Sequence, residues 1–201
     1  MHTLRNSPAS PFGRKVVVAL NILGMTDKVQ TVTADTISAT DTIRSQNPLG
    51  KIPTLMLEDG QALYDSRVII EYLNEVDGRS VLIPSGLQRI EVLRQQALAD
   101  GILDASILRM YEIRFRPTET HSQTWLDHQI GKVDRSMQEA EKTFKVGATT
   151  TPHIGEITMA CVLGYLDFRF AGSWRKTYPH LVAWFDEFHV RVPSFAASTP
   201  K

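Results

Sequence analysis

The spacing of apolar residues changes its period near residue 80 of this 201-residue chain. Before that point, short β-branched runs typical of strands alternate with segments in which apolar residues recur every three to four positions, as in helices. We therefore predict the element order βαβαββα for the first part. The expected elements are strand 2–6, helix 11–23, strand 29–33, a short helix signalled by Ser38 and Asp41, strands 54–57 and 61–64, and helix 66–77.

Turn-forming residues separate these elements. Gly24 follows the first helix and is a typical residue after a helix C-terminus, and Asp59-Gly60 supplies the positive φ angles of a tight hairpin. The segment from Gly78 to Leu87 contains Pro84 and Gly86 and has the composition of a linker. The pattern predicts an α/β domain over residues 1–78, a linker over 79–87 and a second domain over 88–201.

Long helical patterns dominate the second domain. Helices are expected over residues 88–115, 125–144, 158–170 and 179–190, and the third is apolar enough to lie at the centre of the domain. Pro117 ends the first of them. In the helix over 88–115, the residues expected to face inward are Ile90, Leu93, Ala97, Leu98, Gly101, Ile102, Ala105 and Leu108.

Composition and charge exclude some classes of function. The chain is 42% hydrophobic and 22% charged, which is ordinary for a soluble globular protein. Lysine plus arginine and aspartate plus glutamate both number 22, so no net field favours nucleic acid or an anionic membrane. No apolar run reaches the ~20 residues that span a bilayer, and the apolar stretch 16–23 follows Pro11 and Gly13 without a cleavage pattern. With a single cysteine, Cys161, the chain is expected in the reducing cytoplasm.

Ser10-Pro11 joins the first strand to the first helix. Serine is a favoured N-cap and proline a favoured first helical residue, so a purely structural role would give the same sequence. A helix N-terminus also carries partial positive charge that stabilises an anion. A hydroxyl at this position can donate a hydrogen bond to a ligand thiolate.

Two further motifs could hold a peptide-like ligand. Ile52-Pro53 precedes a strand; if the bond is cis, the main chain of Ile52 turns outward and can pair with an extended peptide, whereas an ordinary trans proline would have no such role. Asp65-Ser66 begins a helix, either as simple caps or as groups that receive the carboxylate and amine of an amino-acid ligand.

These motifs, taken in order, resemble those of the glutathione transferase superfamily over nearly the whole chain. The residues that carry the resemblance are Ser10-Pro11-Phe12, Gly50-Lys51-Ile52-Pro53-Thr54-Leu55, Asp65-Ser66 and Pro179-x-Leu181-x-x-Trp184. Segments 99–105, 164–169 and 179–182 further resemble a bacterial subgroup, the YibF-like proteins. The resemblance implies a thioredoxin-like N-terminal domain that binds glutathione, followed by an all-helical C-terminal domain that supplies a pocket for an electrophile.

Carried to this sequence, the resemblance implies a role for each motif. Ser10 would face and stabilise the glutathione thiolate. The other implied contacts are Ile52 with the cysteinyl backbone beside a cis Pro53, Asp65 and Ser66 with the γ-glutamyl end, and Lys51 with the glycyl carboxylate. Asp100 is a weaker candidate for the glutamyl amine, in its own subunit or across a dimer, and is otherwise an acid exposed to solvent.

The implied activity is transfer of glutathione, as co-substrate, to a hydrophobic electrophile by a cytoplasmic homodimer. A glutathione-dependent peroxidase or lyase, and a catalytically weak binding protein of the same fold, are the alternatives. No metal is expected, because the six histidines lack metal-ligand spacing. Arg109 and Tyr111 are candidates for the electrophile pocket, with Arg114 and Arg116 nearby, although cations are also favoured near a helix C-terminus.

Two departures from the family pattern stand out. Family members often begin the central C-terminal helix with Ser or Thr followed three residues later by Asp, whereas here Thr158 leads to Cys161, so this helix start needs another stabilising contact. Redox members have a cysteine near the position of Ser10, and this chain has none there. Cys161 is therefore expected to be a small buried apolar residue.

Overall fold

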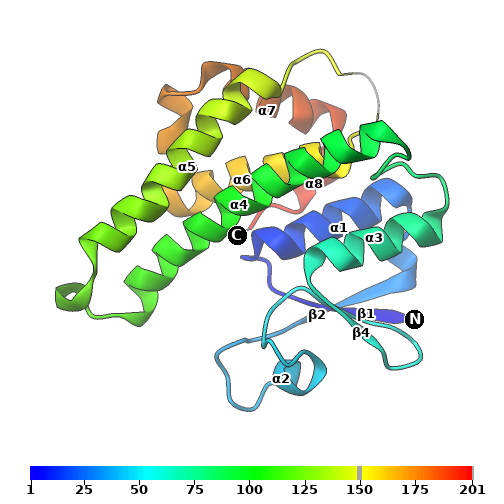
Figure 1. Cartoon of the computed structure of the whole chain (residues 1–201). Helices are drawn as coiled ribbons and strands as arrows, with labels where there is room; N and C mark the ends of the chain where they lie inside the picture. Colours follow the sequence, from blue (N-terminus) through cyan, green and yellow to red (C-terminus); the bar gives the residue numbers. More distant parts are fainter. Residues whose placement is uncertain (149–150, 201) are drawn as a thin grey trace.

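The computed structural model describes residues 1–148 and 151–200 and divides into a small sheet domain and a larger helical domain (Figure 1). The sheet has the strand order β2-β1-β3-β4. Helices α1 and α3 cover one face of it and the short helix α2 lies on the other side (Figure 1). The elements of this domain are β1 (His2–Asn6), α1 (Pro11–Leu23), η1 (Thr26–Lys28), β2 (Val29–Thr33), α2 (Ile43–Gln46), β3 (Thr54–Met56), β4 (Ala62–Leu63) and α3 (Ser66–Asp77).

Strand β1 is the centre of the sheet and is paired on both sides. It runs parallel to β2 and antiparallel to β3, where Leu4 stands opposite Leu55. Both leucines are completely buried and belong to the same apolar core as residues of α1 and α3. Because β1 leads directly into α1, the strand places Ser10 and the start of α1 at one edge of the sheet domain.

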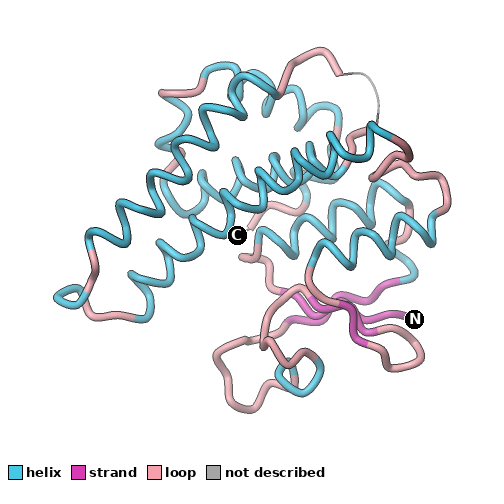
Figure 2. The backbone as a smooth tube through the Cα atoms, in the orientation of Figure 1, coloured by secondary structure: helices cyan, strands magenta, loops and turns pink. Residues whose placement is uncertain are grey.

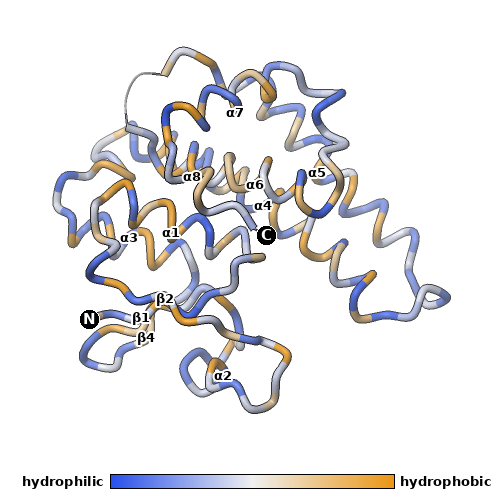
Figure 3. Tube along the Cα trace, turned by 180° about the vertical axis from the view of Figure 1, so that it is seen from behind, coloured by the Kyte–Doolittle hydropathy of each residue, from blue (hydrophilic) through white to orange (hydrophobic). Residues whose placement is uncertain are grey.

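The second domain is a helical bundle built around α6, as Figure 2 shows. Its elements are α4 (Leu87–Phe115), η2 (Thr118–Thr120), α5 (Gln123–Thr143), α6 (Ile154–Phe170), η3 (Ser173–Lys176), α7 (Pro179–Arg191) and α8 (Pro193–Ala197). Helix α6 packs against α4 within the domain and against α1 of the sheet domain. Its first half is buried on all sides, and hydrophobic colouring runs along both α6 and α1 in Figure 3.

The predicted fold class, a thioredoxin-like domain followed by an all-helical domain, is confirmed. Strands β3 and β4 are shorter than expected, and α8 was not predicted. The short helix α2 begins only at Ile43, whose N–H donates to Asp41 Oδ1 at 2.7 Å. Ser38 instead contacts Thr40 within the preceding loop.

The predicted start of the central helix at Thr158 is wrong. Helix α6 begins four residues earlier, with His153 as N-cap and Glu156 completing a reciprocal capping box. The Glu156 N–H donates to His153 Nδ1 at 3.3 Å, and the His153 N–H donates to Glu156 Oε2 at 3.2 Å. A capping pair is therefore present, but it consists of His153 and Glu156 instead of Ser or Thr with Asp. Thr158 and Cys161 lie inside the helix and do not cap it.

The predicted inward face of α4 is wrong in part. Ile102 and Ala105 are buried as expected, but Ile90 and Leu108 are exposed. The buried residues of α4 also include small and polar side chains, which a search for large apolar side chains passes over. The buried positions of α4 are Val92, Gln96, Ala99, Asp100, Ile102, Leu103, Ala105, Ser106 and Glu112.

Among the described residues, no helix combines the length and the hydrophobicity that a membrane-spanning segment requires.

Candidate functional site at the junction of the domains

Ser10 is the N-cap of α1. Its Oγ accepts a hydrogen bond from the Gly13 N–H at 3.1 Å, and Pro11 occupies the first helical position. A hydroxyl can accept two hydrogen bonds and also donate one. Capping therefore uses only an acceptor site of Ser10 and leaves its hydrogen for another group. Ser10 can therefore cap α1 and donate a hydrogen bond to a ligand at the same time.

A small cavity opens beside Ser10, between α1, α6 and the C-terminal segment. Its walls are Ala9, Ser10, Pro11, Arg14, Cys161, Tyr165 and Pro200. Cys161 is completely buried, as expected, and burial raises the pKa of its thiol to about 12. At neutral pH this thiol is protonated, so it is a poor nucleophile despite its place near Ser10.

Arg14 ties the C-terminal segment to the start of α1. Its guanidinium donates to the Phe195 carbonyl at 2.8 Å and to Ser198 Oγ at 3.0 Å, and lies 3.7 Å from the Phe195 ring centroid. Burial lowers the pKa of Arg14, but an arginine stays protonated in proteins. The Arg14 guanidinium is thus a cation held in a fixed position on the cavity wall next to Ser10.

The turn before β3 is held by Asn47, which is fully buried. Asn47 Nδ2 donates to the Lys51 carbonyl and to Thr54 Oγ1, both at 3.0 Å. Thr54 Oγ1 in turn donates to the Lys51 carbonyl at 2.9 Å. The Ile52–Pro53 peptide bond in this turn is cis. These contacts fix the backbone on either side of Ile52.

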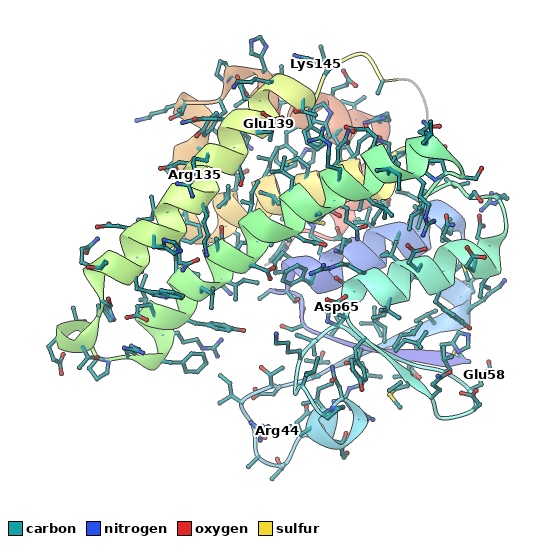
Figure 4. All side chains as sticks on the ribbon, in the orientation of Figure 1. Arg44, Glu58, Asp65, Arg135, Glu139 and Lys145 are labelled. Carbon is teal, nitrogen blue, oxygen red and sulfur yellow. The ribbon has the colours of Figure 1, made fainter. Side chains whose placement is uncertain are left out.

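The N-terminus of α3 forms the third part of the site, and Asp65 marks it beneath α4 in Figure 4. Asp65 is the N-cap, since its Oδ1 accepts from the Arg67 N–H at 2.9 Å. Ser66 is buried at the first helical position. Free N–H groups at a helix N-terminus favour a carboxylate, and the exposed Asp65 adds an anion beside them.

A charge cluster joins the two domains next to this helix start. Lys15 of α1 donates to Asp100 Oδ1 of α4 at 2.7 Å, and the two side chains are 0% and 2% exposed. The alternative that Asp100 is a solvent-exposed acid is therefore wrong. Arg67 Nε lies 3.5 Å from Asp100 Oδ2 and 3.6 Å from Asp65 Oδ2. Arg67 thereby links the buried pair to the surface of α3.

Asp104 lies one turn further along α4, within electrostatic range of the same cluster. Asp104 is exposed, but partial desolvation, and then the negative charge of Asp100, raise the pKa of its carboxyl, while Arg67, Lys51 and Lys15 act in the opposite direction. Cationic and anionic groups thus alternate across the junction. Of these charged groups, Lys51, Arg67 and Asp104 are exposed, whereas Lys15 and Asp100 are buried.

The structure separates the two candidates for the electrophile pocket. Tyr111 is exposed on α4, makes an edge contact with Phe115, and lies within electrostatic range of Tyr165 in the cavity beside Ser10. Arg109 lines a different cavity, between α4, α5 and α6, whose described walls do not include Ser10.

Sequence reasoning missed Arg14, Lys15, Arg67 and Asp104. Arg67 directly follows the Asp65-Ser66 motif, so its position in the sequence could have identified it as a candidate site residue. Lys15 and Asp100 are 85 positions apart, and only the packing of α1 beside α4 brings them together. Within the described residues, no group of three or more potential ligands could hold a metal ion.

A thioredoxin-like sheet with a cis proline before β3, a serine that caps α1 and an added helical bundle define the class of protein by its fold: a thioredoxin-like domain followed by an all-helical domain. The comparisons agree with this class. The family model described as "Glutathione S-transferase, N-terminal domain" matches residues 9–76, and the C-terminal domain model matches residues 123–187.

The chain belongs to the glutathione S-transferase superfamily. It is 34% identical to the "Uncharacterized GST-like protein YibF" of Escherichia coli K12 over 98% of both chains. It is similar to a glutathione transferase family member from Pseudomonas fluorescens Pf-5 solved with bound glutathione, at 41% identity, a TM-score of 0.90 and full coverage of both chains. A glutathione S-transferase from Methylobacillus flagellatus solved with glutathione gives 32% identity, full coverage and a TM-score of 0.91.

Proposed function

We propose that this protein is a glutathione transferase that ionises the thiol of glutathione beside Ser10 and transfers the thiolate to a hydrophobic electrophile. The observation that carries the proposal is the Ser10 hydroxyl, which caps α1 through an acceptor site and retains its hydrogen for a sulfur atom. Relatives at 32% and 41% identity that were solved with glutathione support the same ligand here.

The ligand's two ends match the two remaining parts of the site. The N-terminus of α3, with Asp65 and Ser66, would hold the γ-glutamyl carboxylate and amine, and the main chain of Ile52 would pair with the cysteinyl residue. Lys51 would bind the glycyl carboxylate. Asp100 would act on the glutamyl end through Arg67, because Lys15 already occupies its Oδ1 and the side chain is 2% exposed.

Ser10 and the N-terminus of α1 can together supply the free energy needed to stabilise the thiolate of glutathione. An ordinary thiol has a pKa of ~8.5, and lowering it by about two units takes ~2.7 kcal/mol of preferential stabilisation of the anion. A hydrogen bond to a charged group contributes ~1.5–3 kcal/mol, and a helix N-terminus adds ~0.3–1 kcal/mol. In this mechanism Ser10 stabilises the nucleophile, which is glutathione itself. The thiol proton passes to solvent. In substitution, the carbon–sulfur bond forms as the bond to the leaving group breaks; in conjugate addition, it forms as the carbon–carbon double bond opens, and the α-carbon then takes a proton from solvent.

Glutathione is expected to bind the purified protein with a dissociation constant in the millimolar range or tighter, measured by titration calorimetry. Arg67→Ala should weaken binding, because it removes the cation between Asp65 and Asp100. Arg94→Ala is the matched control, since Arg94 is also about half-exposed but pairs with Glu91 elsewhere on α4. Absence of heat at millimolar glutathione would exclude the proposed ligand.

The class of electrophile decides between the proposed transferase and its alternatives. Turnover of aryl halides or unsaturated carbonyls with loss of free thiol would support conjugation. Turnover of peroxides alone, with formation of glutathione disulfide, would support a glutathione-dependent peroxidase instead. Binding of glutathione without turnover of any of these would indicate a binding protein of the same fold.

We further propose that the protein acts as a homodimer. Apolar side chains of α3 and α4 are exposed in the single chain, among them Val68, Leu87 and Ile90. Sedimentation velocity is expected to give twice the mass of the chain, and the double variant Leu87→Glu, Ile90→Glu should sediment as a monomer. Val190→Glu, at an exposed apolar position on α7, should leave the mass unchanged.

A further inference from the structure

The start of the central helix α6 packs closely against α4 and the segment that precedes it. The first helical residue, Ile154, donates its N–H to the Leu82 carbonyl at 2.9 Å. Gly155 has no room for a side chain, because a Cβ there would lie 2.7 Å from Cβ of Gln95 and 3.1 Å from the Val92 carbonyl oxygen. The first turn of α6 is thus held between these segments, where its unpaired N–H groups need partners.

His153 caps this turn as a hydrogen-bond acceptor. Its Nδ1 accepts the Glu156 N–H at 3.3 Å, and an imidazole nitrogen accepts a hydrogen bond only when it carries no proton. The cap therefore requires a neutral imidazole with its hydrogen on Nε2. Protonation would turn Nδ1 into a donor that faces a second donor, the Glu156 N–H, at the positive end of the helix dipole.

The charged groups that face His153 come from α6, α7 and α4. Glu156 Oε2 lies 3.7 Å from His153 Nε2, but the same carboxylate already accepts from Arg191 of α7 at 2.6 Å, through Oε1. Glu91 of α4 lies within electrostatic range and pairs with Arg94 at 2.8 Å. Partial burial lowers the pKa of His153. Glu156 and Glu91 oppose this change and Arg191 adds to it, and the net direction is downward.

We propose that His153 makes the start of α6 sensitive to pH: the cap holds while the imidazole is neutral, and its protonation loosens the first turn of the helix. The serine or threonine that commonly caps helices has no such titration. The unfolded chain, in which histidine has its ordinary pKa of ~6.5, binds the proton more readily than the folded protein does. The cap's contribution to stability is therefore fully present above about pH 6.5 and declines as the pH falls below it. Because α6 packs against both α1 and α4, the loosening acts where the two domains meet, with or without glutathione.

Hydrogen exchange of the Glu156 amide, followed by NMR and corrected for the intrinsic pH dependence of exchange, tests the proposal. In the wild type, protection of this amide should fall about five- to tenfold from about pH 7.5 to about pH 5.5, the size typical of a lost N-cap. His153→Asn should keep its protection within about twofold, because the asparagine oxygen accepts the same hydrogen bond and does not titrate. His128→Asn is the matched control: His128 is exposed on α5, and this variant should respond to pH as the wild type does.

Two further measurements separate this cap from other groups that titrate in the same range. The midpoint of urea denaturation should fall more on acidification in the wild type than in His153→Asn, since the difference between the two cancels every group that they share. In the wild type alone, the NMR titration of the His153 ring should have its midpoint below ~6.5, and the Glu156 amide shift should follow it. Equal loss of Glu156 protection in the wild type and His153→Asn would overturn the proposal. So would a His153 midpoint at or above ~6.5, which decides the question even if the variant does not fold.

Discussion

Replacing Lys15 with methionine is expected to lower the free energy of unfolding by about 3–5 kcal/mol. The variant keeps the volume and length of the side chain but removes the charge that faces Asp100 at 2.7 Å. Asp100 would then be an anion that is 2% exposed, with only the longer 3.5 Å contact to Arg67. Arg67 is 57% exposed, so water screens much of its charge.

Chemical denaturation with a double-mutant cycle measures this effect. The variant Lys15→Met, Asp100→Leu removes both charges and should recover most of the lost stability, since apolar pairs often replace buried ion pairs without loss. The matched control is Arg94→Met, which breaks an exposed pair with Glu91 on the same helix and should cost only about 0.3–0.5 kcal/mol. A loss below about 1 kcal/mol for Lys15→Met, or a double variant no more stable than the single one, would contradict the assignment.

Loss of the Lys15–Asp100 pair should also affect the proposed glutathione site. The pair joins α1, which carries Ser10, to α4, beside which α3 presents Asp65 and Ser66. Loss of the pair would let the two helices separate at the junction where the ligand's sulfur and its glutamyl end are proposed to bind. We therefore expect the double variant, although stable, to bind glutathione less tightly than the wild type.

Helix ends were predictable where the capping residue was of a common type. Ser10-Pro11 and Gly24 mark both ends of α1, and the start of α3 at Ser66 follows from Asp65 in the same way. The start of α6 was missed because histidine is an uncommon N-cap, although His153 and Glu156 have the spacing of a capping box. Capping residues therefore determine where these helices begin and end, and the prediction fails where the capping residue is of an uncommon type.

Side-chain environments on α4 were harder to predict because they depend on its neighbours. Asp100 has the sequence context of a surface acid, and only its contact with Lys15 across the domain boundary explains its burial. Arg109 and Tyr111 are two positions apart, which is about 200° around a helix, so they face different sides of α4. Proximity in sequence suggested one pocket, whereas Arg109 lines a cavity of the helical domain and Tyr111 is exposed on another side of α4.

The second large effect is expected at Ser10. Replacing Ser10 with alanine removes the donor proposed for the bound sulfur, so the thiolate of bound glutathione loses stabilisation relative to the thiol and its pKa rises. A hydrogen bond to a charged group is worth ~1.5–3 kcal/mol, which corresponds to an increase of about 1–2 pKa units. Ultraviolet absorbance of the thiolate, followed against pH with the protein saturated in glutathione, measures this increase directly.

Alanine also removes the cap of α1, at a cost of about 0.5–2 kcal/mol in stability, so two further variants separate capping from catalysis. Ser10→Thr keeps both the acceptor and the donor and should titrate like the wild type. Ser10→Asp caps as well as serine does, but an ionised carboxylate only accepts hydrogen bonds and repels a thiolate. This variant should therefore remain stable while thiolate appears at a higher pH than in the alanine variant. If instead the aspartate and alanine variants both titrate like the wild type, Ser10 serves only as a cap, and the thiolate must be stabilised by another group, for which the buried cation Arg14 on the same cavity wall is a candidate.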